Sequence, residues 1–163
     1  MAGPFKVALH KKNPAWMPEK AHDDDSGFDL KARVVCPLLN GNVGEEMILE
    51  NGPYYLAPRH RILVKTGVFI ALEKGWEAQI RPRSGMALKY GITITNAPGT
   101  IDAGYRNEIG VILHNLGDGQ YAIGYKHKIA QMVIQTLPAV SIQQVDFLDD
   151  TERGKNGFGS TGA

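Results

Sequence analysis

Residues 81–85, Arg-Pro-Arg-Ser-Gly, have the side chains and spacing of a phosphate-binding segment. An apolar alternation ends at Pro82, and Arg83 follows with a planar guanidinium suited to phosphate oxygens. Ser84 and Gly85 open a short helical pattern, whose first N–H groups lack internal partners and carry partial positive charge. The segment therefore predicts an anion site. A capped turn with a surface arginine explains the same residues equally well.

Residues 96–106 form a second polar segment whose side chains could bind a ligand or take part in a reaction. An apolar run enters a Pro-Gly turn, and Asp102 lies three residues before Tyr105. A hairpin here would present backbone groups, together with the Asn96 and Asp102 side chains, to a ligand. The alternative is an ordinary hairpin with an aspartate in its turn.

Two further segments contain polar side chains in surroundings that the fold alone does not explain. Gln131 interrupts the apolar run at 129–136, as a ligand group or as a residue at a barrel mouth or edge would. The glycines of residues 153–162 allow the backbone to approach a phosphate closely. Phe158 between two glycines could stack on a base, while Ser160 and Thr161 can donate to phosphate oxygens.

Many short strands must position these segments. Apolar alternation or β-branched runs predict strands at 62–64, 68–72, 76–81, 92–95, 111–114 and 129–136, with Val140, Ile142 and Val145 closing the pattern. One short helix is expected at 84–91, with Ser84 capping its start and Gly91 its end. Residues 38–54 look like a surface excursion. The pattern favours an all-β sandwich, jelly roll or barrel.

Composition limits the function classes. The 163 residues fit one domain, 43% are apolar, and 18 basic against 17 acidic residues give a net charge of +1. Nucleic-acid binding usually brings a basic surplus, so a small anionic ligand is favoured. We expect no membrane span, no zinc site among the five histidines, a cytoplasmic location, and a buried rather than nucleophilic thiol at Cys36.

Five segments, taken in order, resemble the five motifs of the homotrimeric dUTPase family. They lie at residues 25–32, 81–87, 99–108, 128–131 and 153–162. The resemblance implies an all-β, distorted jelly-roll or β-barrel with one short helix, assembled as a homotrimer with a C-terminal arm exchanged between subunits. Residues 1–150 would form the jelly-roll domain, and residues 151–163 a flexible arm closing over the active site.

The resemblance also implies an activity. The family hydrolyses dUTP to dUMP and diphosphate by attack of water on the α-phosphate, with Mg2+ on the triphosphate; this supplies dUMP for thymidylate synthesis and keeps uracil out of DNA. Asp102 matches the general base, Tyr105 the residue under the deoxyribose, and Asp29 the carboxylate that holds the metal through water. The remaining matches are substrate-binding: Asn96, Gly99, Thr100, Ile101 and Gly110 at uracil, Arg83, Ser84, Gly85 and Gln131 at phosphate, Phe158 capping the base, and Arg153, Gly159, Ser160 and Thr161 from the arm.

The chain departs from the family pattern at three places. Asn107 and Asn156 stand where glycine is usual, and Asn is the residue other than glycine that best tolerates a positive φ. Lys126 and His127 replace the usual Gly-Asp, for which we expect a local rearrangement. The competing interpretations are a dCTP deaminase of the same fold, a protein that grips a regulatory partner through residues 38–54, and a β-sandwich without chemistry.

Overall fold

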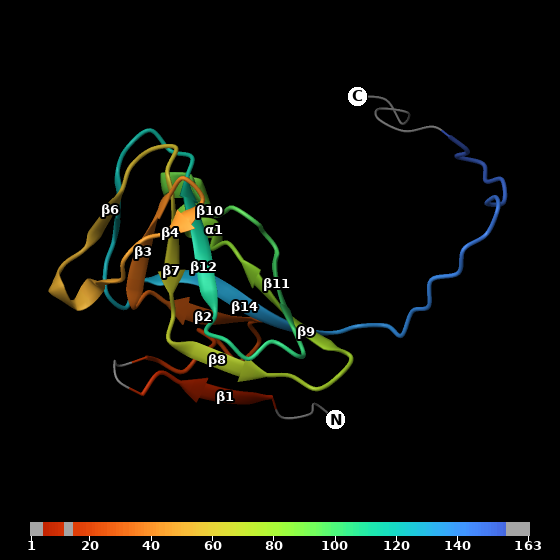
Figure 1. Ribbon diagram of the computed structural model, residues 1–163, viewed down its shortest axis with the longest axis horizontal. Helices are drawn as coiled ribbons and strands as arrows, with labels where there is room; N and C mark the ends of the chain where they lie inside the picture. Colours follow the sequence, from red (N-terminus) through yellow and green to blue (C-terminus); the bar gives the residue numbers. More distant parts are fainter. Residues whose placement is uncertain (1–4, 12–14, 156–163) are drawn as a thin grey trace.

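The computed structural model describes residues 5–11 and 15–155, and strands with a single short α-helix make up its regular structure (Figure 1). This confirms the all-β class expected from the sequence. The strands are β1 (Lys6–Leu9), β2 (Gly27–Lys31), β3 (Val34–Leu39), β4 (Asn42–Val43), β5 (Met47–Ile48), β6 (Tyr54–Leu56), β7 (Arg61–Lys65), β8 (Val68–Ala71), β9 (Trp76–Arg81), β10 (Ile92–Ile94), β11 (Gly99–Asp102), β12 (Gly110–Asn115), β13 (Tyr121–Ile123) and β14 (Lys128–Thr136). The helices are α1 (Ser84–Tyr90) and the single 3-10 turn η1 (Leu49–Asn51).

Two larger sheets enclose the core. One has the order β10-β12-β7-β3-β4, with β5 also paired to β3, and the other has the order β11-β9-β14-β2. The short pairs β1-β8 and β13-β6 complete the structure. Alternate residues of each strand turn inward, as Val111 and Leu113 do in β12. These inward side chains form one apolar cluster with Ile80 of β9 and Met132 of β14, which fixes both sheets relative to each other.

Helix α1 follows β9 directly and ends where the sequence predicts. Gly91 adopts a left-handed conformation with φ of 65°, and its N–H bonds to the carbonyls of Ala87 and Met86. The predicted cap at the other end is wrong. Arg83 occupies the N-cap position with extended backbone and no side-chain cap bond, so Ser84 is already the first helical residue.

Residues 38–54 form the expected excursion, built from the end of β3 and from β4, β5 and η1. Cys36 in β3 is buried as predicted, and burial raises the pKa of its thiol. Gly67, with φ of 74°, makes the bend between β7 and β8. No described helix is long and apolar enough to cross a membrane.

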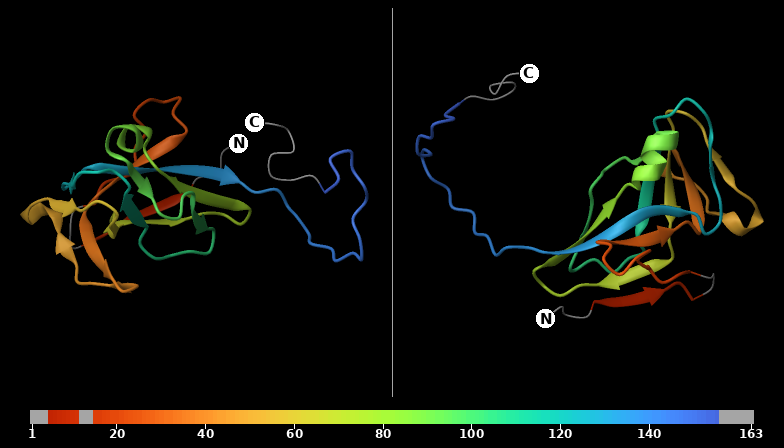
Figure 2. Two further views of the ribbon diagram at one scale, coloured as in Figure 1. Left: turned by 90° about the horizontal axis from the view of Figure 1, so that it is seen from above. Right: turned by 180° about the vertical axis from the view of Figure 1, so that it is seen from behind.

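The chain after β14 differs from the prediction. Residues 137–155 contain no strand, and they run away from the body in every view (Figures 1 and 2). Val140, Ile142 and Val145 were expected to close the strand pattern, but all three are exposed. An alternating pattern makes a strand only where a partner edge is available, and this segment lies beside none within its own chain.

The departures from the family pattern are absorbed locally. Lys126 takes the left-handed conformation, with φ of 65°, and its ammonium lies over the rings of Trp16 and Tyr125. His127 Nδ1 accepts a hydrogen bond from Gly124 N–H at 3.1 Å. Asn107 was expected to replace glycine because Asn tolerates a positive φ, but its φ is not positive. Its side-chain oxygen instead accepts a hydrogen bond from Glu108 N–H at 2.8 Å.

Candidate active site

A polar pocket of about 300 Å³ lies where β2, β9, β14 and α1 meet. Its walls come from three separate parts of the chain: residues 21–29, residues 81–85, and β14. The lining residues are Ala21, Asp25, Ser26, Gly27, Asp29, Arg81, Arg83, Ser84, Gly85, Gln131 and Val133. The structure thus brings together the predicted residues Asp29, Arg83, Ser84, Gly85 and Gln131.

Strand β14 aligns these groups because it pairs with β2 on one edge and β9 on the other. Gln131 lies opposite Asp29 on β2 and opposite Arg81 on β9. Its amide Nε2 donates to the Pro82 carbonyl at 2.9 Å, which ties β14 to the turn before α1. Gly27 leaves room for this side chain, since a Cβ there would lie 2.7 Å from Gln131 Oε1. The register therefore fixes where the amide sits.

Basic groups outnumber acidic groups around the Asp29 carboxylate. Arg83 Nη1 pairs with Asp29 Oδ1, and Lys128 Nζ lies 2.7 Å from Asp29 Oδ2. The Asp29 side chain is about 10% exposed, so both pairs are sheltered from water more than a surface pair is. Arg81 adds a third cation, oriented by Gln79 Oε1 at 3.1 and 2.7 Å. An entering anion thus meets Arg81 and Arg83 in the pocket lining, with Lys128 adjacent through its pair with Asp29.

The third predicted segment lies outside this pocket. Residues Gly99–Asp102 form β11, which pairs with β9 so that Asp102 lies opposite Glu77 and Gly99 opposite Ile80. The predicted hairpin is wrong, because β12, which begins at Gly110, pairs with β7 and β10 in the other sheet. Residues 103–109 therefore connect two sheets, and two-residue alternation alone could not reveal which sheet each strand joins.

The β9 register separates the two groups of candidate residues within one chain. Glu77, opposite Asp102, and Arg81, beside the pocket, are four residues apart, or roughly 13 Å along an extended strand. Asn96 and Tyr105 also lie outside the residues that line the pocket. Asn96 Nδ2 stands near Gly99, 3.4 Å from where a Cβ would be, so the amide and β11 form one local unit.

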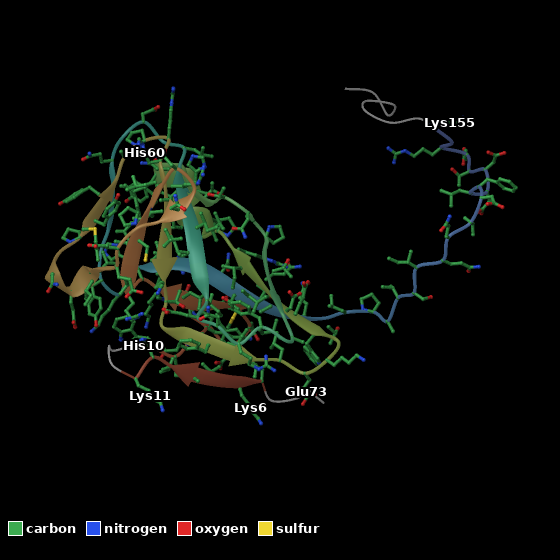
Figure 3. All side chains as sticks on the ribbon, viewed as in Figure 1. Lys6, His10, Lys11, His60, Glu73 and Lys155 are labelled. Carbon is green, nitrogen blue, oxygen red and sulfur yellow. The ribbon has the colours of Figure 1, made fainter. Side chains whose placement is uncertain are left out.

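Of the C-terminal candidates, only Arg153 lies within the described residues. Arg153 is exposed near the end of the arm, and Figure 3 places its neighbour Lys155 well away from the body. Gly159, Thr161, Ser160 and Phe158 lie outside the described residues, as does Asn156.

The donor set of the pocket fits a magnesium ion that arrives with phosphates. Mg2+ retains several waters and uses one or two carboxylates plus substrate phosphates. Asp25 and Asp29 supply two carboxylates at the pocket, and both oxygens of Asp29 already face cations. Across residues 5–11 and 15–155, no group of three or more His, Cys, Asp or Glu side chains could hold a metal. Contact with Asp29 through water agrees with this arrangement.

Sequence reasoning missed several residues of the pocket. Asp25, Ser26 and Gly27 lay within a recognised motif, and Arg81 and Lys128 flank Arg83 and Gln131 in the chain, yet none was assigned to the site. Charged residues at the ends of the predicted strands were the signal that could have identified these residues. That they lie close together depends on the register of β14, which cannot be read from the sequence.

Comparison with known proteins agrees with this geometry. The family model described as dUTPase matches residues 48–162. The deoxyuridine 5'-triphosphate nucleotidohydrolase of Clostridium tetani is 46% identical over 97% of this chain and 96% of its own. That of Roseobacter denitrificans is 52% identical over 84% of this chain and 80% of its own.

A solved structure, the G164S variant of Staphylococcus bacteriophage 80alpha dUTPase with dUpNHpp, superposes with a TM-score of 0.79. It is 26% identical and covers 99% of this chain and 100% of its own. Sequence match, fold and the order of the polar segments converge: the chain belongs to the dUTPase family.

Proposed function

We propose that this protein hydrolyses dUTP to dUMP and diphosphate, in sites formed between the subunits of a homotrimer. One observation carries the proposal. A pocket lined by two arginines and an ordered amide lies beside β9, and the same strand pairs with β11, which bears a carboxylate. The pocket suits a polyphosphate, and the carboxylate suits a proton acceptor.

The phosphate chain binds in the pocket. Arg83 releases part of its interaction with Asp29 to contact phosphate oxygens, and the Ser84 hydroxyl and Gly85 N–H face the same space. The Gln131 amide, held by the Pro82 carbonyl, adds a neutral donor. Because these groups are fixed before the substrate arrives, they stabilise the charge that develops during phosphoryl transfer.

The base and sugar bind to the segment around β11. Asn96 and the backbone of residues 99–101 hold uracil, with Gly110 nearby, and the Tyr105 ring packs under the deoxyribose. Asp102 accepts a proton from the water that attacks the α-phosphorus in line with the departing diphosphate. Asp29 would hold a bound Mg2+ through water, and the ion would neutralise part of the phosphate charge.

The separation along β9 supports a composite site. Within one chain Asp102 pairs with Glu77, roughly 13 Å along β9 from Arg81 at the pocket, so we propose that β11 of a second subunit meets the pocket of the first. The arm gives a second argument. Val140, Ile142, Phe147 and Leu148 are more than four-fifths exposed, so a neighbouring subunit is the natural cover for them. We propose that this exposed segment after β14 continues into residues 151–163, which close over the site.

Diphosphate release from dUTP tests the proposal, with dCTP, dTTP and UTP as controls and with EDTA in parallel. Hydrolysis confined to dUTP and lost with EDTA is expected. Asp102→Asn, nearly isosteric but unable to accept the proton, should lower kcat by about 10²- to 10⁴-fold. Ammonia release from dCTP would instead favour a deaminase, and an intact trimer inert towards every nucleotide would refute the proposal.

A further inference from the structure

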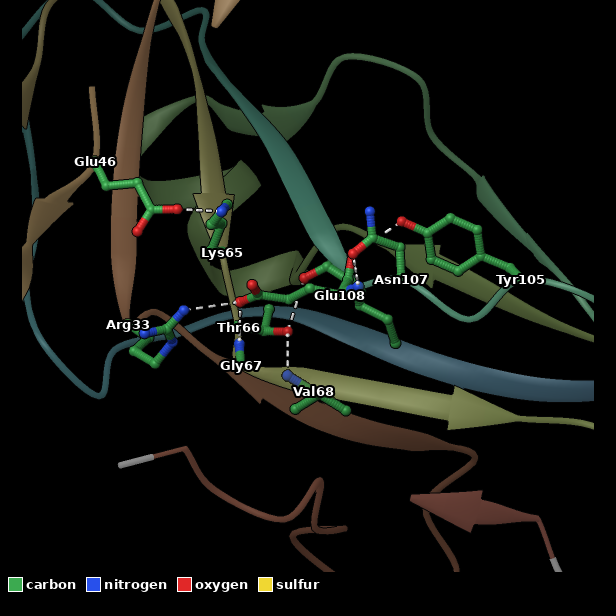
Figure 4. Close-up of polar contacts among 10 residues, drawn as sticks. Arg33, Glu46, Lys65, Thr66, Gly67, Val68, Tyr105, Asn107 and Glu108 are labelled. Carbon is green, nitrogen blue, oxygen red and sulfur yellow. Dashed lines mark hydrogen bonds and ion pairs between the residues drawn. The ribbon is translucent and has the colours of Figure 1, made fainter. Parts of the chain in front are cut away.

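A buried ion pair lies away from the pocket, at the foot of the loop that follows Asp102. Arg33, in the link between β2 and β3, places Nη2 3.1 Å from Oε1 of Glu108, in the loop between β11 and β12 (Figure 4). Their side chains are only 2% and 10% exposed. The two residues are 75 positions apart, so the contact exists only in the folded protein.

The same carboxylate oxygen also accepts a backbone hydrogen bond. Gly67 N–H donates to Glu108 Oε1 at 2.6 Å, from the bend between β7 and β8. A Cβ at Gly67 would lie 2.5 Å from Ala15 Cβ and 3.0 Å from Arg33 Nε, so this bend is fitted closely to the arginine. Three segments distant in sequence therefore meet at one oxygen atom.

The backbone next to Glu108 is held at the same place. Ile109 N–H donates to the Val68 carbonyl at 2.8 Å, and the Ile109 carbonyl accepts from the Thr66 hydroxyl at 2.8 Å. The Thr66 hydroxyl also accepts from Val68 N–H at 3.2 Å. Together with the ion pair, these bonds make the C-terminal end of the loop a fixed point.

The fixed point extends towards Tyr105. The Tyr105 hydroxyl donates to the Glu108 carbonyl at 3.0 Å, while Tyr105 N–H bonds to the Asp102 carbonyl at 3.0 Å. The side-chain oxygen of Asn107 holds Glu108 N–H from the other side. The position of the tyrosine ring thus depends on where residue 108 is anchored.

We propose that Arg33 and Glu108 are positioning residues, which set the Tyr105 ring and the Asp102 carboxylate at the geometry needed to select a deoxyribonucleotide and activate water. The inference rests on the proposed function. A buried ion pair contributes little net stability compared with apolar side chains of similar size, but it defines one arrangement. Its effect is therefore expected in alignment rather than in folding.

The test compares Arg33→Met, Glu108→Gln and the double variant Arg33→Met/Glu108→Leu with wild type. Arg33→Met and Glu108→Gln each leave one buried charge without its partner, so both should be less stable than wild type and should lower kcat for dUTP. The double variant removes both charges together, so it should fold, but kcat for dUTP should fall by at least about tenfold with little change in KM, because small misplacements of reacting groups are costly. The ratio of kcat/KM for dUTP to that for UTP should also fall, by about tenfold.

Glu46→Gln is the matched control. It removes the exposed ion pair of Glu46 with Lys65 of β7 (Figure 4) and leaves the bonds from Arg33 and Gly67 to the Glu108 carboxylate in place. Its kcat and nucleotide preference should equal those of wild type.

Amide hydrogen exchange separates this inference from the proposed function. In the double variant the amides of Tyr105, Glu108 and Ile109 should exchange faster, while those of β9 and β14 stay protected. If wild type does not hydrolyse dUTP but the loop amides of the double variant exchange faster, the proposed function is refuted. The anchoring of the loop by the ion pair would still hold. A folded double variant with unchanged exchange, kcat and dUTP preference would refute the positioning role.

Discussion

At the scale of single residues, the Glu46–Lys65 pair gives the fold a pH dependence of known sign. The hydrogen bond from Lys65 holds the pKa of Glu46 below its usual 4.5. The stabilisation is therefore present above about pH 4.5 and is lost as the pH falls through the lowered pKa in the folded state. The same bond raises the pKa of Lys65.

Replacing Glu46 by Gln should lower the free energy of unfolding at pH 7 by only a few tenths of a kcal/mol, because the pair is largely exposed and screened by solvent. Urea unfolding of both proteins at pH 7 and at pH 3 measures this. The difference should be smaller at pH 3 than at pH 7, and it should shrink in high salt at pH 7. An equal difference at both pH values would contradict the assignment.

Residue types in short segments predicted the polar groups of the pocket but not their partners. Arg83 and Gln131 were identifiable because each follows or interrupts an apolar run. The ion pairs of Asp29 with Arg83 and Lys128 were not, since they join β2 to the N-cap of α1 and to β14. For the Arg33–Glu108 pair the sequence carries no local signal at all.

At the scale of elements, the turn that ends α1 requires glycine for its backbone conformation and for lack of space. Gly91 has φ of 65°, and a Cβ there would lie 2.7 Å from Gly117 N. Gly91→Ala should destabilise the protein by about 1–2 kcal/mol for the left-handed backbone, with the steric overlap adding to this. Thermal unfolding measures the effect.

Gly85→Ala is the contrasting variant in the same helix. A Cβ at Gly85 meets nothing within 4 Å, so stability should stay unchanged or rise by up to about 1 kcal/mol. Hydrolysis should fall nonetheless, because the added methyl group enters the pocket. Equal destabilisation by the two substitutions would contradict the role given to the left-handed backbone at Gly91.

Two-residue alternation predicted where the strands lie in the sequence, but it did not predict which strands pair. β9, β12 and β14 lie close to the predicted ranges. The assignment of β11 and β12 to different sheets, and the lack of a strand at Val140–Val145, depend on which edges are available in space. That information is tertiary, so periodicity alone could not supply it.

At the scale of the whole molecule, a site shared between subunits predicts rescue by mixing. Arg83→Ala and Asp102→Asn trimers should each be inactive. When the two variants are refolded together, random assortment should give about a quarter of the sites an intact Arg83 from one chain and an intact Asp102 from the next. The mixture should then recover about a quarter of wild-type activity, measured as diphosphate release. No recovery from mixed trimers of verified composition would place both residues of a site on one chain.

The excursion has a consequence for colloidal behaviour. β3 would otherwise end its sheet with a long open edge, and the two-residue strands β4 and β5 cover that edge at Leu38–Leu39 and Val34–Val35. Short edge strands offer few free backbone groups to another molecule. Replacing residues 39–48 with a Gly-Ser link should therefore make the protein scatter light at lower temperature and concentration while hydrolysis persists. Unchanged scattering would show that covering this edge does not prevent aggregation. The expected increase would show that β4 and β5 keep folded molecules from associating through the edge of β3.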